Sequence, residues 1–159
     1  MIKKLWSAVF CVGLLVAVGM SIGDEGKSWF DIHNCGMCKN MAAEEGLMDN
    51  LNWETHKISN GMVTITTIGT GYQEKFERAT KNMQATAQKM MAGEEVHLCG
   101  FCTSYGNLMM AGVSSDIVES EVGVIQLITS NDEAVVKQIH DHAQHTIDAY
   151  EQWLAEKGS

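Results

Sequence analysis

The sequence contains no proline and carries little positive charge. Without proline, no cis X-Pro peptide bond can stand beside a reactive thiol. Lysine and arginine together number 11 against 20 aspartate and glutamate residues, which leaves a net charge of −9. A chain this acidic repels phosphate polymers, so the composition argues against nucleic acid as a partner.

Long apolar runs are also absent, apart from one near the N-terminus. Lys3 and Lys4 precede an apolar stretch that extends from Leu5 to about Ile22 and ends among small residues. This pattern predicts a secretory signal over residues 1–23 and an exported protein, periplasmic or secreted. An uncleaved membrane anchor is the alternative, because roughly 18 apolar residues reach the lower limit for crossing a bilayer. Contact with a membrane is expected only through this segment.

The cysteines outside this segment all belong to one repeated motif. Cleavage after residue 23 would remove Lys3, Lys4 and Cys11, and would take the net charge from −9 to −11. The four remaining thiols lie in two copies of H-x-C-G-x-C, which read HNCGMC at 33–38 and HLCGFC at 97–102. The second copy begins 64 residues after the first, which indicates an internal duplication.

The residues after each motif follow one plan. Helix-forming stretches at 39–51 and 103–112 precede candidate hairpins, whose strands are expected at 53–59 and 62–68, and at 116–121 and 124–129. Asn60-Gly61 is a strong hairpin signal because both positions tolerate positive φ, and Val122-Gly123 is a weaker one. Amphipathic helices with one apolar stripe each are expected from about 72 to 91 and from 135 to 154.

These patterns predict an α+β fold of two duplicated α-β-β-α halves. Their strands would form a four-stranded antiparallel sheet that is packed by helices. We place the halves at residues 24–93 and 94–159, both within one compact domain. The glycines expected at the two hairpin turns differ by 62 positions, and the helices by about 60, which loops of different length explain.

The repeated motif supplies ligands for a soft or borderline metal ion. A CxxC pair at the start of a helix gains the positive end of the helix dipole, which favours thiolate over thiol. Thiolate with imidazole suits zinc or copper(I). The candidate ligands could form one four-thiolate site that joins the halves, or two separate sites of two thiolates and one imidazole; they are Cys35, Cys38, Cys99, Cys102, His33 and His97.

Two other functions compete with metal binding. In the first, the protein is a periplasmic thiol–disulfide redox protein in which Cys35 and Cys99 attack. In the second, each CxxC is a disulfide that only braces a structural, partner-binding module, although so short a loop makes a weak staple. The sequence has no Ser–His–Asp order, phosphate-binding glycine loop or paired-carboxylate signature. This favours a binding protein over an enzyme with a catalytic residue.

Comparison with known CxxC proteins says more about the fold of this chain than about its function. The thioredoxin family sets a cis-proline against its thiols, and a chain without proline does not fit it. The stretch GVIQLITSNDEAVVKQIHDHA at 123–143 resembles exported bacterial proteins that combine paired CxxC motifs with a hairpin and a helix. The resemblance covers only the second half of the chain, and it implies a fold rather than an activity.

The remaining histidines and methionines have simpler interpretations. We interpret His140, His142 and His145 as a solvated, partly boundary face of the last helix, with a secondary copper or nickel site as the alternative. His56 is interpreted as a structural residue on a half-buried strand. The helix methionines are interpreted as adaptable core filling, whereas Met37 lies within reach of a copper(I) ion if one is bound.

Overall fold

The computed structural model describes residues 28–157, so the predicted signal or anchor at 1–23 lies outside the described residues. The elements occur in the order α-β-β-α, α-β-β-α. They are α1 (Lys39–Ala42), β1 (Leu51–Ile58), β2 (Gly61–Ile68), α2 (Gln73–Met91), α3 (Gly100–Met110), β3 (Ser114–Ser120), β4 (Gly123–Thr129) and α4 (Glu133–Lys157). Among the described helices, none is long and apolar enough to cross a membrane.

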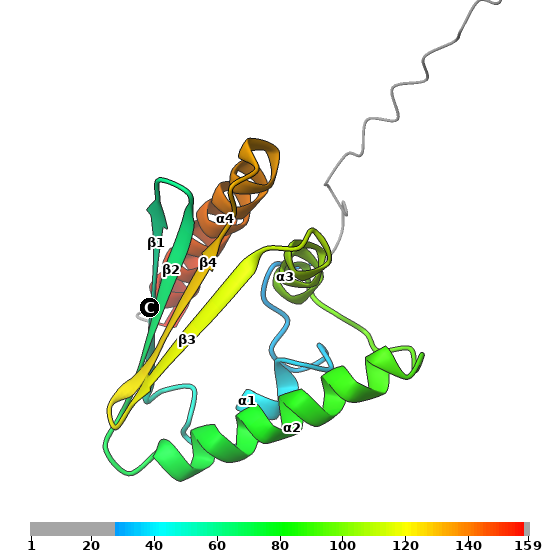
Figure 1. Cartoon of the computed structure of the whole chain (residues 1–159). Helices are drawn as coiled ribbons and strands as arrows, with labels where there is room; N and C mark the ends of the chain where they lie inside the picture. Colours follow the sequence, from blue (N-terminus) through cyan, green and yellow to red (C-terminus); the bar gives the residue numbers. More distant parts are fainter. Residues whose placement is uncertain (1–27, 158–159) are drawn as a thin grey trace, which may run out of the picture.

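The strands form one antiparallel sheet in the order β1-β2-β4-β3 (Figure 1), which confirms the predicted α+β fold class. The register between the central strands has two-fold symmetry. Thr64 pairs with Gln126, its own counterpart 62 residues later, and Thr67 pairs with Gly123. The halves therefore meet along β2 and β4, with the symmetry axis beside Thr64.

Both hairpins form, but the predicted turn positions were one residue too late. Ile58 pairs with Gly61, so the first turn consists of Ser59 and Asn60, and no described residue other than glycine has positive φ. Gly61 instead lies in the sheet, where a Cβ would stand 2.0 Å from the Ile128 carbonyl oxygen. The second half repeats this: a Cβ on Gly123 would stand 2.0 Å from the Thr66 carbonyl oxygen. Both glycines permit the close approach of β2 and β4.

The main core lies between α4 and one face of the sheet. Ile139 and Ala143 of α4 pack with Met62 of β2, Ile128 of β4 and Leu108 of α3, and all five are buried. The apolar stripe predicted for this helix is therefore the side that covers the sheet.

The first half packs differently from the second. The helix expected at 39–51 ends after one turn, because the chain bends through separate turns to Gly46, which adopts a φ of +73°. A second cluster of Leu47, Leu51 and Ala79 then holds α2 by its N-terminal half. In Figure 1, α2 leaves the end of the sheet and diverges from it, so only part of its predicted stripe is covered.

Candidate metal centre

The second motif stands at the start of α3, as predicted. Cys99 is the N-cap residue with extended backbone, and its carbonyl oxygen accepts the first helical hydrogen bond, from the Thr103 N–H at 2.9 Å. The Gly100 N–H donates to the Ser28 carbonyl oxygen at 3.1 Å, and a Cβ at this glycine would stand 3.1 Å from Trp29. Ser28 and Trp29 thus pack closely against the second motif.

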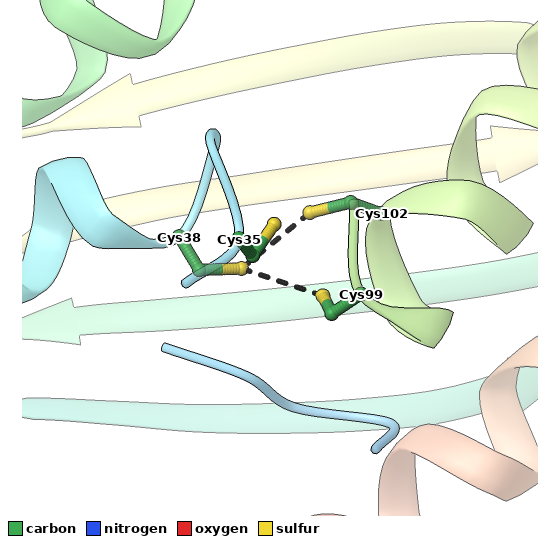
Figure 2. A group of neighbouring side chains, drawn as sticks. All are labelled: Cys35, Cys38, Cys99 and Cys102. Carbon is green, nitrogen blue, oxygen red and sulfur yellow. Dashed lines mark hydrogen bonds between the residues drawn. The ribbon is translucent and has the colours of Figure 1, made fainter. Parts of the chain in front are cut away.

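The first motif forms a helical turn that leads into α1. The Cys35 N–H donates to the Asp31 carbonyl oxygen, and the Lys39 N–H donates to the Cys35 carbonyl oxygen, each at 3.0 Å. Cys38 has helical backbone and caps α1. This turn directs the side chains of Cys35 and Cys38 toward α3 (Figure 2).

A backbone contact brings the two motifs together. The Gly36 N–H donates to the His97 carbonyl oxygen at 2.8 Å. A Cβ on Gly36 would stand 2.2 Å from the side chain of Val96, so a larger residue would separate the two segments. The glycine of the first CxxC therefore serves the contact between the halves.

The four cysteine sulfurs form a single group, which Figure 2 shows converging from the two motifs. All four lie within 4.8 Å of one another, and Cys38 Sγ is 3.7 Å from Cys99 Sγ and 3.4 Å from Cys102 Sγ. A tetrahedral ion with metal–sulfur bonds of 2.3 Å requires sulfurs about 3.8 Å apart. The arrangement fits one shared four-thiolate site, which is the first of the two predicted possibilities.

Burial divides the four thiols into two classes. Cys35 and Cys99 are 0 % and 1 % exposed, whereas Cys38 and Cys102 are partly exposed. The two thiols predicted to attack in a redox reaction are thus the inaccessible ones. None of the four is in a disulfide, so the structure does not contain the two short staples of the structural alternative.

Crowding makes the thiols titrate unequally. The pKa of Cys99 is lowered, because the thiols of Cys102 and Cys38 donate hydrogen bonds to it, together with the backbone N–H groups of Cys102 and Asp31. The pKa of Cys102 is raised, because its contacts with Cys38 and Cys99, and its burial, favour the protonated form. Deprotonation of Cys99 is therefore favoured, whereas a bound cation would be needed to displace the proton of Cys102.

The two motif histidines do not join the sulfur group. His33 and His97 are both exposed, and the group that could hold an ion consists of the four cysteines. The pKa of the Asp31 carboxyl is lowered by the Asn34 N–H and, to a smaller degree, by its electrostatic interaction with His97. Their part as auxiliary ligands or supporting groups remains a prediction.

The histidines of α4 are dispersed. His140 Nε2 lies 2.8 Å from the Ile58 carbonyl oxygen, while His145 is exposed and packs edge-on against Trp29. His142 is only 2 % exposed, which corrects its predicted place on a solvated face, and its Nδ1 lies 2.9 Å from Ser104 Oγ. In the part of the chain that the structure describes, the four cysteines are the only group of three or more potential ligands.

Sequence reasoning missed the aromatic wall beside the centre. Trp29, Phe101 and His142 pack together, with the His142 ring 5.1 Å from that of Phe101 and 5.5 Å from that of Trp29. Phe101 lies within the second CxxC, so this wall braces one side of the motif. The only sequence signal was the place of His142 at the edge of the apolar stripe of α4.

Comparisons with protein-family models, curated proteins and solved structures found no match to this chain. The function is therefore inferred from the chemistry of the site itself.

Proposed function

We propose that this protein binds one zinc ion through the thiolates of Cys35, Cys38, Cys99 and Cys102, and that the ion joins its two halves. The observation that carries this proposal is the convergence of four sulfurs within 4.8 Å from motifs 64 residues apart. Two CxxC pairs with tetrahedral spacing are the usual ligand set of a structural zinc site. Among the described residues, no histidine or carboxylate belongs to this sulfur group.

Zinc is preferred to copper(I) because all four sulfurs belong to the group and two of them are buried. Such a closed site retains an ion rather than passing it to a partner. Copper(I) is the second candidate ion, since thiolate ligands suit it as well. Met37, between the thiols of the first motif, would then be an additional soft donor.

The zinc centre would compensate for the weak packing of the first half. The first half contributes only three residues to its own buried cluster, Leu47, Leu51 and Ala79. An ion held by Cys35 and Cys38 would tie this region to α3, which belongs to the main core through Leu108. Binding free energy of the ion then becomes folding free energy of the first half.

Export is part of the same proposal. The apolar segment at 1–23 supports delivery to an oxidising compartment, where clustered free thiols tend to form disulfides. Coordination keeps thiolates from that reaction by occupying their lone pairs. An exported protein with four thiols in one group is thus best explained if the thiols hold a metal.

Metal analysis and thiol counting test the proposal together. Protein purified from the exported compartment should contain about one zinc ion per chain. After denaturation with a chelator, four thiols should react with a chromogenic disulfide reagent. Protein without metal and without reactive thiols would contradict zinc binding.

Thiol–disulfide exchange is the second candidate function, and the 3.4 Å contact between the partly exposed Cys38 and Cys102 favours it. In that case these two thiols, rather than the buried Cys35 and Cys99, would react with a partner. A reduction potential close to that of known periplasmic oxidants would support exchange, whereas a potential below about −300 mV would indicate a structural bond.

A further inference from the structure

The edge strand β3 is the most exposed strand of the sheet. α4 contacts β1, β2 and β4, while all seven residues of β3 are exposed. In Figure 1, α4 lies along the β1–β2 side of the sheet and β3 forms the opposite edge. Of the eight large apolar side chains that are exposed in residues 28–157, six lie between Met109 and Ile125. These side chains lie on both faces of the hairpin: Ile117 is on one face, and Val118 with its pairing partner Ile125 is on the other.

The internal symmetry identifies the element that would cover the face of the hairpin that carries Ile117. The central strands repeat with a shift of 62 residues, and the stripe of α2 repeats that of α4 with a shift of about 60, so Met83 corresponds to the buried Ala143. A helix equivalent to α4 would therefore lie over β3 and β4. Within its own chain, α2 does not, because Ala79 is its only fully buried residue.

The C-terminal half of α2 contains no fully buried residue and has the properties of the missing cover. Its apolar stripe continues through the half-buried Met83, Ala87 and Met90 to Met91, which is 80 % exposed. Met90 corresponds to Tyr150, which packs on Trp53 of β1 in the covered half. The stripe is thus only partly covered within its own chain.

Charge also favours this pairing. The β3–β4 hairpin, residues 114–129, has three acidic residues and no basic one, which gives −3. α2 has four basic and two acidic residues, which gives +2 within an otherwise acidic chain. Two hairpins facing each other would repel, whereas α2 and the hairpin attract.

We propose that the C-terminal half of α2 from a second copy of this chain packs over the β3–β4 hairpin, and that two copies exchange this contact in a two-fold dimer. Each chain offers one such helix and one such hairpin, so a reciprocal exchange closes without leaving either surface free. The helix lands on the face that carries Ile117, which is 59 % exposed. That face is the helix side of the sheet, because Ile117 pairs with Gln126, whose amide donates to Tyr105 of α3 at 2.7 Å.

A contact in the half of the sheet that α4 covers, β1 and β2, predicts one specific contact across the dimer interface. There, Lys57 Nζ donates to Gln144 Oε1 of α4 at 2.7 Å. The counterpart of Lys57 is Glu119, by the shift of 62, and the counterpart of Gln144 is Gln84, by the shift of 60. Glu119 of one copy should therefore face Gln84 of the other.

Sedimentation velocity on the purified, metal-loaded protein tests the dimer. The wild type should sediment as a dimer of the 17.5 kDa chain, or of its processed form. Ile117→Glu and Met91→Glu alter exposed positions on the two surfaces, and each should raise the dimer dissociation constant about tenfold or more. Leu154→Glu is the matched control, since Leu154 is 47 % exposed on α4, outside both proposed surfaces. This variant should leave the dimer dissociation constant unchanged.

A charge exchange tests the pairing of helix with hairpin. Gln84→Glu alone should weaken the dimer, because it sets a second carboxylate against Glu119, and the addition of Glu119→Lys should restore it. Circular dichroism checks that each exposed variant keeps its fold. A monomer at all concentrations up to about 100 µM would overturn the proposal. So would a dimer that Ile117→Glu disrupts but Met91→Glu and Gln84→Glu leave intact, or a double variant as weak as Gln84→Glu alone.

Discussion

Replacement of Cys99 by serine should remove the metal entirely rather than by half. Cys99 is 1 % exposed and belongs to the same sulfur group as the thiols of the first motif, at 3.7 Å from Cys38. A shared site that loses one of four thiolates loses its ion, whereas two independent sites would keep one ion of two. The expected metal content of Cys99→Ser is therefore close to zero per chain.

The stability of the variant should fall by a predictable amount. At a free zinc concentration 1,000-fold above the dissociation constant, a bound ion stabilises the folded state by about 4 kcal/mol. For the 130 residues described here, each kcal/mol corresponds to roughly 4 °C in Tm, so the loss is about 15 °C. The loss should be concentrated in the first half, because the main core between α4 and the sheet contains no part of the centre.

Metal analysis by inductively coupled plasma mass spectrometry and differential scanning calorimetry measure the two effects. His97→Ala is the matched control, since His97 is exposed in the same motif but outside the sulfur group, and it should keep both the metal and the Tm. Half of the wild-type metal content in Cys99→Ser would refute a shared site. An equal loss in His97→Ala would show that imidazole is a required ligand.

Three further predictions follow from burial, sulfur geometry and strand packing. Burial, and then the charge on His145, lower the pKa of His142 from 6.5 to about 4, so protonation favours the unfolded chain. The contribution of His142 to the free energy of unfolding should therefore be complete above pH 6.5 and decline as the pH falls toward 4, with a loss of about 2 kcal/mol at pH 5. Urea unfolding of Cys99→Ser measures this loss without a contribution from metal release. The dependence of stability on pH should disappear when His142→Gln is added. In metal-free protein, hydrogen peroxide should oxidise the partly exposed Cys38 and Cys102, 3.4 Å apart, to one disulfide with release of two water molecules. This bond closes a loop of about 65 residues and should stabilise the protein by about 4 kcal/mol relative to its reduced, metal-free form. Peptide mapping that finds only disulfides within each CxxC would contradict the sulfur geometry. Gly123→Ala should destabilise the protein by about 3 kcal/mol in urea unfolding, since its Cβ would stand 2.0 Å from the Thr66 carbonyl oxygen. Gly106→Ala in α3 is the control: its Cβ would have no neighbouring atom within 4 Å, so this variant should be neutral or stabilising.

Local patterns were sufficient for the order of elements. Alternation of apolar residues and paired glycines located both hairpins, and stripes at helical spacing located α2 and α4. Residue types were less informative where tertiary contacts decide the backbone. Gly61 and Gly123 were interpreted as turn residues, but their lack of a Cβ is required by the neighbouring central strand, which is distant in sequence.

In the candidate site, too, some features follow from local sequence and others depend on tertiary contacts. The available ligand atoms, four thiols in two H-x-C-G-x-C motifs, could be predicted from the sequence, since ligand chemistry and spacing are local properties. The meeting of the two motifs could not be predicted, because a distance across 64 residues depends on how β2 pairs with β4 and how Gly36 approaches His97. The tertiary structure also buries Cys35 and Cys99 while it leaves Cys38 and Cys102 partly exposed, because burial depends on the neighbours that folding brings to each side chain.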